Sequence, residues 1–139
     1  MAKAPLISIV EDDELFRDSM RRLLRSLGYT VEAFPSAANF LAYRSFDETA
    51  CLITDIHMPA MTGHELYARL TEWGHKIPTI LVTAYPNEAA RSRALKDGIV
   101  CYLLKPFDDN DFADCVQKAV ERGKPLGLHE AVFAAGKVN

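Results

Sequence analysis

The sequence predicts an α/β fold in which helices cover both faces of a parallel sheet. Five short apolar runs alternate with segments whose apolar residues recur every three or four positions, as they do on one face of a helix. The runs are mostly apolar, which is typical of strands that are buried on both faces. Strands that are each followed by a helix indicate a doubly wound sheet.

The five strands are predicted at Leu6–Val10, Thr30–Phe34, 50–54, Thr79–Thr83 and 100–104. Each connection between parallel strands should be a right-handed crossover. Periodicity alone does not give the order of the strands. The common arrangement for five strands is the flavodoxin-like order 2-1-3-4-5, so we expect this sheet, with five helices.

Helical segments follow the strands, and residues that favour helix ends mark their limits. Gly28 closes the first helix, and Ser36 can cap the second. The fourth helix, at 87–96, has few apolar residues, and the fifth follows Asp108 or Asp109. The apolar positions that mark the other helix faces are Phe16, Met20, Leu23, Leu24 and Leu27; Phe40 and Leu41; Leu66, Leu70 and Trp73; and Phe112, Val116 and Val120.

The composition is that of one globular domain of 139 residues, of which 49% are hydrophobic and 25% charged. A net charge of −3 argues against broad electrostatic binding to nucleic acid or to an anionic membrane. No apolar stretch approaches the roughly 20 residues that span a bilayer, and no signal peptide is evident. Three cysteines without a CxxC spacing favour neither a disulfide nor a metal site. We therefore expect a cytoplasmic protein that binds neither nucleic acid nor membrane directly.

Polar residues stand where four of the predicted strands end. Three acidic residues at 11–13 follow the first strand, and Asp55 follows the third. Thr83 ends the fourth strand, and Lys105 follows the fifth. The carboxyl ends of parallel strands share one edge of the sheet, where open α/β sheets bind their ligands. We expect these residues to meet there.

The charges at this edge indicate a particular chemistry. Carboxylates that lie close together repel one another and need a counter-charge. Lys105 can supply one, and a hard divalent cation such as Mg²⁺ can supply another through carboxylate oxygens. Asp55 would then be the nucleophile of a phosphoryl transfer that gives an acyl phosphate. Thr83 and Lys105 would donate hydrogen bonds to the phosphoryl oxygens.

Four motifs in this order resemble the receiver domain of bacterial two-component response regulators. They are the acidic cluster, Asp-x-x-Met-Pro-x-Met-x-Gly from Asp55, Val-Thr-Ala around Thr83, and Tyr-x-x-Lys-Pro-Phe from Tyr102. The resemblance covers residues 5–122, which leaves 123–139 as a C-terminal tail or the start of a linker. The segments Glu-Leu-Phe-Arg-Asp-Ser and Lys-Pro-Phe-Asp look most like the FixJ branch.

The resemblance implies that Asp55 accepts a phosphoryl group from a sensor histidine kinase, with Mg²⁺ or Mn²⁺ as the cofactor. In the family, an Arg often follows the second acidic residue by five positions, so Arg17 indicates Asp12 as the direct metal ligand. Glu11 would then act mainly through water. The implied metal ligands are Glu11, Asp12, Asp55 and the backbone carbonyl of His57.

The resemblance also implies roles near the phosphoryl group. Thr83 and Lys105 would bind the phosphoryl oxygens, and Thr83 with Tyr102 would switch the surface where partners dock. Pro106 would follow a cis peptide bond. His57 could modulate hydrolysis of the acyl phosphate, and the alternative for its side chain is a solvated loop histidine.

The sequence leaves three alternative functions to be distinguished. The leading one is a phosphorylation-controlled signalling module that is not an enzyme with a diffusible substrate. A phosphohydrolase with an aspartyl nucleophile usually has a second Asp two residues later, where this chain has His57, and needs a covering cap. A docking module that never takes phosphate would not need all these polar sites. The partner would be a downstream output protein, or a C-terminal output domain beyond this chain, and phosphorylation could lead to a homodimer.

Overall fold

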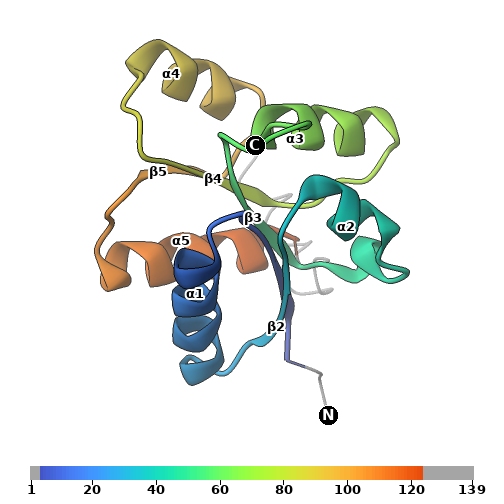
Figure 1. Cartoon of the computed structure of the whole chain (residues 1–139), viewed down its shortest axis with the longest axis vertical. Coiled ribbons are helices and arrows are strands. Elements are labelled where there is room, and N and C mark those ends of the chain that lie inside the picture. Colours follow the sequence, from blue (N-terminus) through green and yellow to red (C-terminus); the bar gives the residue numbers. More distant parts are fainter. Residues whose placement is uncertain (1–3, 124–139) are drawn as a thin grey trace, which may run out of the picture.

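The computed structural model describes residues 4–123, and it confirms the predicted doubly wound fold. Five parallel strands form one sheet in the order β2-β1-β3-β4-β5 (Figure 1). The strands are β1 (Leu6–Val10), β2 (Thr30–Phe34), β3 (Cys51–Asp55), β4 (Thr79–Thr83) and β5 (Cys101–Leu104). The helices are α1 (Glu14–Ser26), α2 (Ala37–Ala42), α3 (Gly63–Glu72), α4 (Glu88–Lys96) and α5 (Asp109–Gly123), with a short 3₁₀ helix at Phe46–Glu48.

The strands bury side chains on both faces of the sheet. Ile9 of β1 lies opposite Ile53 of β3, and Ile53 lies opposite Ile80 of β4. This row of fully buried isoleucines packs against α1 and α5, whereas Leu52 points to the other face. Full burial of each such side chain contributes roughly 1.5–3 kcal/mol, which explains why the strands are apolar throughout.

The face covered by α1 and α5 holds one continuous cluster of 14 buried residues (Figure 1). Met20 and Leu24 of α1 and Phe112 and Val116 of α5 lie in it. The predicted apolar stripes of both helices thus meet the sheet along their length. This face anchors β1, β3 and β4, whose carboxyl ends carry the polar residues described above.

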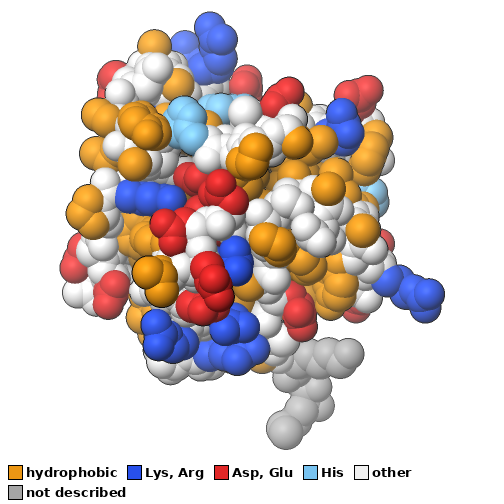
Figure 2. Space-filling view, viewed as in Figure 1, with side chains coloured by type: hydrophobic (Ala, Val, Ile, Leu, Met, Phe, Trp, Pro, Cys, Tyr) orange, Lys and Arg blue, Asp and Glu red, His pale blue; other side chains and the backbone are white. Residues whose placement is uncertain are grey.

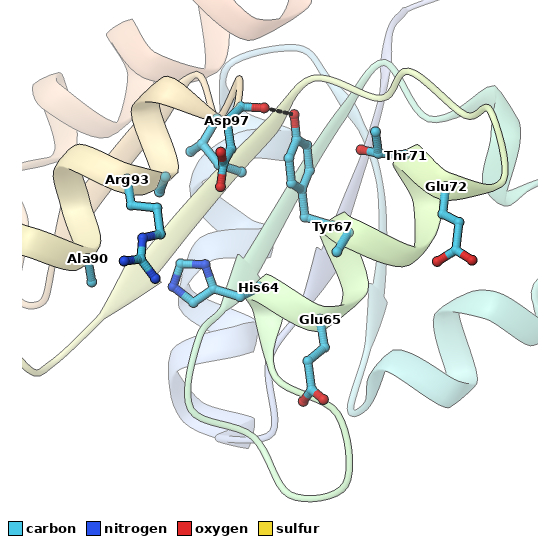
Figure 3. Close-up of a pocket in the computed structure, with 11 residues that line it drawn as sticks. His64, Glu65, Tyr67, Thr71, Glu72, Ala90, Arg93 and Asp97 are labelled. Atoms are coloured by element: carbon cyan, nitrogen blue, oxygen red, sulfur yellow. Dashed lines mark hydrogen bonds between the residues drawn. The ribbon is translucent and has the colours of Figure 1, made fainter.

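The opposite face divides into two smaller clusters. One contains eight buried residues under α2 and α3, and the other contains four residues near α4. A cavity of about 870 Å³ opens between α3 and α4, and His64 and Arg93 extend into the same part of it (Figure 3). The hydroxyl of Tyr67 on α3 donates to the carbonyl of Asp97, at 3.1 Å, and so links the two helices at one end.

Some predicted positions differ from those observed. Trp73 and Leu27 were expected on buried helix faces, but they are 53% and 46% exposed. Each is the C-cap of its helix and precedes a glycine with positive φ, Gly74 or Gly28, where the chain turns out of the helix. Ser36 caps α2 as predicted, because its hydroxyl accepts from the backbone N–H of Asn39.

Strand β3 extends one residue further than predicted. Asp55 is its last residue and lies opposite Val82 in the ladder, so its backbone is fixed by the sheet. Strand β5 begins at Cys101, one residue later than expected. Of the predicted tail 123–139, all but the first residue lies outside the described residues.

The surface at the carboxyl ends of the strands is strongly charged. Figure 2 shows acidic side chains gathered near the middle of this view, with a basic side chain extending beside them. Within residues 4–123, no helix combines the length and the apolar character that a membrane span requires.

Candidate functional site

The site lies where β1, β3 and β5 end, and a glycine allows the chain to close over it. Gly63 begins α3, and its N–H donates to the carbonyl of Ile56 at 3.0 Å. A Cβ placed on Gly63 would lie 2.6 Å from the backbone oxygen of Asp55. Only glycine permits this approach, so the last residue of the Asp-x-x-Met-Pro-x-Met-x-Gly motif brings the loop after β3 back against Asp55.

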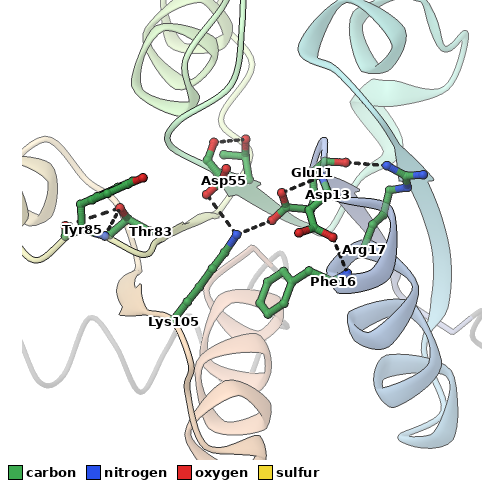
Figure 4. A network of polar contacts seen from close by, with 9 residues as sticks. Glu11, Asp13, Phe16, Arg17, Asp55, Thr83, Tyr85 and Lys105 are labelled. Atoms are coloured by element: carbon green, nitrogen blue, oxygen red, sulfur yellow. Dashed lines mark hydrogen bonds and ion pairs between the residues drawn. The ribbon is translucent and has the colours of Figure 1, made fainter.

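The centre of the site is an ion-pair network around Lys105. Its ammonium lies 2.8 Å from Oε1 of Glu11 and 3.4 Å from Oδ1 of Asp55 (Figure 4). The Glu11 side chain is 1% exposed, that of Asp55 8% and that of Lys105 18%. Three residues separated widely in sequence therefore meet in one largely buried ion-pair network, as the strand order predicts.

Glu11 is held at several points. Its Oε2 accepts from the backbone N–H of Asp13 at 3.1 Å, and the guanidinium of Arg17 donates to its carbonyl at 2.8 Å. Asp13 in turn caps α1, because its carboxylate accepts from the N–H of Phe16. The extra acid of the cluster therefore orders the start of α1, while Arg17 fixes the loop that carries Glu11.

Burial and charge change the protonation equilibria here. Burial raises the pKa of Glu11 above its ordinary value, although hydrogen bonding to Lys105 opposes this. Burial raises the pKa of Asp55 as well, against the attraction of Lys105. Burial alone would lower the pKa of Lys105, but bonding to Glu11 and attraction to both carboxylates outweigh it, so that pKa is raised. The raised pKa of Lys105 keeps the ammonium charged, and this charge offsets the repulsion between the two carboxyl groups.

Three carboxylates form a group that fits a hard divalent cation. Glu11, Asp12 and Asp55 each offer one oxygen, and these oxygens lie within 4.8 Å of one another. Asp12 is exposed, whereas Glu11 is already bonded to Lys105. Carboxylate oxygens gathered in this way are the donors that Mg²⁺ and Mn²⁺ bind in proteins. His57, whose carbonyl is a predicted ligand, follows in the exposed loop after β3.

Thr83 is buried at the end of β4, but its hydroxyl is turned aside from the ion pairs. It accepts from the N–H of Tyr85 at 3.0 Å (Figure 4). Among the interactions of the described residues, none joins this hydroxyl to Asp55 or to Lys105. The backbones do meet, because the N–H of Lys105 donates to the carbonyl of Thr83 at 2.7 Å.

The other two predicted residues on this side are Tyr102 and His57. Tyr102 is half-buried and packs against the small cluster near α4 that contains Leu81 and Ala94. The ring of His57 lies edge-on to that of Tyr85, with centroids 4.8 Å apart. Both rings are exposed beside the site. Of these two residues, only His57 was predicted from the sequence to lie near the phosphoryl group.

Sequence reasoning missed an aromatic group next to Lys105. The ammonium lies 4.2 Å from the centroid of the Phe16 ring, and Phe107 packs edge-on to that ring. Phe16 was predicted only as part of the buried face of α1. Its position four residues after Asp12 places it near the site, but the sequence does not show which way its ring turns. The peptide bond between Lys105 and Pro106 is cis in the structure.

The fold and the site define a doubly wound protein whose carboxylates and lysine meet at the carboxyl edge of its sheet. The chain belongs to the family of response regulator receiver domains, whose family model matches residues 7–117.

The sequence of the chain is also similar to those of named regulatory proteins. The chain is 36% identical over 119 residues to nodulation protein W of Bradyrhizobium diazoefficiens. The match covers 86% of this chain and 52% of that protein. It is 31% identical over 126 residues to the transcriptional regulatory protein FixJ of the same species, covering 91% of this chain and 62% of FixJ. The response regulator protein TodT of Pseudomonas putida is 32% identical over 119 residues, covering 86% and 52%. The chain spans about half the length of the curated relatives it matches.

Solved structures show the same similarity. The crystal structure of FixJ-N superposes with a TM-score of 0.78 at 31% sequence identity, covering 90% of this chain and all of that one. The predicted resemblance to receivers of the FixJ branch is therefore confirmed.

Proposed function

We propose that this chain is a phosphoacceptor receiver in which Asp55 takes a phosphoryl group from a sensor histidine kinase. One observation carries the proposal: Lys105 bridges the buried carboxylates of Glu11 and Asp55, and the exposed carboxylate of Asp12 lies beside them. A carboxylate nucleophile beside a fixed ammonium is what transfer to an aspartate requires, because negative charge develops on the phosphoryl oxygens. The receiver comprises residues 5–122, with 123–139 as a tail or linker.

The transfer step has a simple balance. A carboxylate oxygen of Asp55 attacks phosphorus, and a P–O bond forms as the P–N bond of the donor phosphohistidine breaks. The electron pair of the broken bond returns to the imidazole nitrogen, which takes a proton from solvent. Asp55 must be ionised for this attack, and Lys105 stabilises the oxygens of the transferring group. Hydrolysis later breaks the P–O bond when water attacks phosphorus, releasing phosphate and the free carboxylate.

A divalent cation belongs to this proposal because the donor set fits it. Asp12, Asp55 and the carbonyl of His57 would hold it, with Glu11 acting mainly through water. When bound, Mg²⁺ or Mn²⁺ would supply positive charge beside the phosphoryl oxygens. The position of Glu11 supports its indirect role, since one of its oxygens already pairs with Lys105.

Switching would begin at Thr83. Its hydroxyl bonds the N–H of Tyr85 in this structure and would leave it for a phosphoryl oxygen. Tyr102, half-buried beside α4, would turn further inward as that hydroxyl moves. The surface of α4, β5 and α5 would then present a new shape to its partner. That partner would be a downstream output protein, or an output domain beyond this chain, and a phosphorylation-dependent homodimer is a third outcome.

The proposal assigns the chain no diffusible substrate of its own, because its chemistry acts on its own aspartate. It also places the chain in the cytoplasm, without direct contact to nucleic acid.

The exposed ring of His57 would modulate the hydrolysis of the acyl phosphate by controlling the approach of water. Replacing it as His57→Asn should change the lifetime of the acyl phosphate while leaving phosphorylation of Asp55 intact.

The test uses a small phosphodonor. Wild-type protein incubated with acetyl phosphate and Mg²⁺ should gain the mass of one phosphoryl group, and this group should be labile in base. Asp55→Asn should gain none. Asp13→Asn is the matched control, because the Asp13 side chain caps α1 and the substitution keeps both a capping oxygen and the backbone N–H that bonds Glu11, so this variant should be phosphorylated as well as the wild type. Absence of any mass gain, or steady turnover of generic phosphoesters, would overturn the proposal.

A further inference from the structure

The ammonium of Lys105 has a third neighbour besides its two carboxylates. It lies 4.2 Å from the centroid of the Phe16 ring, within the range of a cation–π contact (Figure 4). The side chain of Lys105 is only 18% exposed, so little water competes for the ammonium. Such a contact contributes more when it is desolvated than at an open surface.

The Phe16 ring is itself held in place. Phe107, which follows the cis Lys105–Pro106 bond, packs edge-on to it with centroids 5.5 Å apart. Phe107 in turn stacks on the fully buried Phe112 of α5, at 4.9 Å and an interplanar angle of 8°. A column of three rings therefore joins α1, the segment before α5 and α5 itself beneath Lys105. The ring that meets the ammonium has little freedom to turn.

We propose that Phe16 is a positioning residue that holds the ammonium of Lys105 where it can reach a phosphoryl group on Asp55. This inference rests on the proposed function, and it adds a residue that none of the four sequence motifs contains. Phe16 acts through Lys105 and does not touch the reacting atoms.

A neutral partner has an advantage over another carboxylate at this place. Glu11 and Asp55 attract the ammonium strongly, but each would also draw it away from a phosphoryl oxygen, because they carry full negative charges. The face of an aromatic ring attracts a cation without accepting a strong hydrogen bond. Lys105 can therefore exchange a carboxylate for a phosphoryl oxygen while the ring keeps its chain in one rotamer.

The alternative is that Phe16 only fills space, since it also packs against the core cluster of α1 and α5. Two substitutions separate the roles. Phe16→Leu keeps an apolar side chain but removes the ring face, whereas Phe16→Tyr keeps the face. A positioning role predicts that phosphorylation by acetyl phosphate slows about three- to tenfold in Phe16→Leu and stays within about twofold in Phe16→Tyr. Equal slowing in both variants, or none in either, would overturn the proposal.

A double-mutant cycle asks whether Phe16 acts through Lys105. Phe16→Leu should slow the wild type but have no further effect on Lys105→Met, because the ammonium is then already absent. If Phe16→Leu slows phosphorylation by the same factor in both backgrounds, the ring acts independently of Lys105 and the proposal is wrong. Urea unfolding of each variant checks that the fold is retained.

A second readout needs no phosphate and no metal. In the NMR spectrum of protein labelled in lysine, the terminal CH₂ and ammonium protons of Lys105 should be shifted upfield by the ring current. This shift should disappear in Phe16→Leu and persist in Phe16→Tyr. An unshifted Lys105 signal in the wild type would refute the inference about Phe16, even if Asp55 is phosphorylated. A shifted signal without phosphorylation of Asp55 would instead refute the proposed function.

Discussion

The two faces of the sheet are packed unequally. On one face, α5 alone buries four side chains in a continuous cluster of 14 residues. On the other, α4 buries only Ala94, in a cluster of four residues, and a cavity of about 870 Å³ separates it from α3. A hydrogen bond from the hydroxyl of Tyr67 on α3 to the carbonyl of Asp97, the C-cap of α4, links the two helices.

The difference indicates which parts of the domain are rigid. The cluster of α1 and α5 fixes the strands whose ends hold Glu11 and Asp55, and the aromatic column below Lys105 belongs to the same side. Because few apolar contacts hold α4 against the sheet, displacing this helix should cost little free energy of folding. The residues proposed for the chemistry thus end strands that the firmly packed face holds, whereas Tyr102 of the proposed switch lies beside α4 on the loosely packed face.

The largest expected effect tests the firm face. Phe112→Ala removes a fully buried ring from the core and should lower the free energy of unfolding by about 3–5 kcal/mol. Leu95→Ala on α4 is the matched variant, since Leu95 is 36% exposed, and it should cost less than about 1 kcal/mol. Urea unfolding measures both. Equal losses would show that the two faces are not packed unequally.

The second-largest effect concerns Asp55, at the carboxyl edge of the sheet, and its contribution to the free energy of unfolding. Burial raises the pKa of Asp55, so the folded state binds a proton there more readily than the unfolded chain does. The stability that this group contributes is complete at low pH and is lost as pH rises through the raised pKa. In metal-free buffer at neutral pH, Asp55→Asn should therefore be more stable than the wild type by about 1 kcal/mol, or about 3 °C in Tm.

The pH dependence checks the cause of that gain. The advantage of Asp55→Asn should shrink as the pH falls through the raised pKa of Asp55 toward about 3.9, the ordinary pKa of Asp, and should be absent below that value, because both proteins are then uncharged at position 55. Thermal unfolding at several pH values follows it. A gain that is the same at all pH values would mean that charge burial is not its origin.

A third, smaller effect addresses the link between α3 and α4. Tyr67→Phe removes the hydroxyl that donates to Asp97 and should lower the protection of α4 amides against hydrogen exchange by about 0.5–1 kcal/mol. Amides of α5 should be unaffected. Loss of protection in both helices together would contradict the view that α4 opens separately.

The smallest effect is expected on the exposed side of α4. Glu88 and Arg91 form an ion pair at 3.2 Å with both side chains well exposed. Such pairs contribute little, so Arg91→Ala should shift Tm by no more than about 1 °C. A larger fall would mean that surface charge, rather than burial of Ala94, holds α4 to the sheet.

The fold could be predicted because its signals are local. Apolar runs define the strands, and Gly28 and Ser36 mark helix ends through their own backbone and side-chain preferences. The exposure of Trp73 could not be foreseen from periodicity, which does not show where a helix stops and the chain turns away. The same limit applies to the one-residue extension of β3 through Asp55.

The site was predicted in part for the same kind of reason. Strand order brings Glu11, Asp55 and Lys105 together, so their ion pairs follow from topology. Which way a side chain turns depends on rotamers and local partners. The bond from the Tyr85 N–H to the Thr83 hydroxyl and the Phe16 ring over Lys105 are of this kind, and no spacing in the sequence specifies them.

Chemical trapping of the phosphorylated residue is the most direct measurement of the central proposition, that a nucleophilic carboxylate ends β3. Borohydride reduces an aspartyl phosphate to homoserine, which peptide mass spectrometry can locate. After treatment with acetyl phosphate and Mg²⁺, homoserine should be found at position 55 and at no other aspartate. Homoserine at position 12 or 13, or its absence despite incorporated phosphate, would contradict the account.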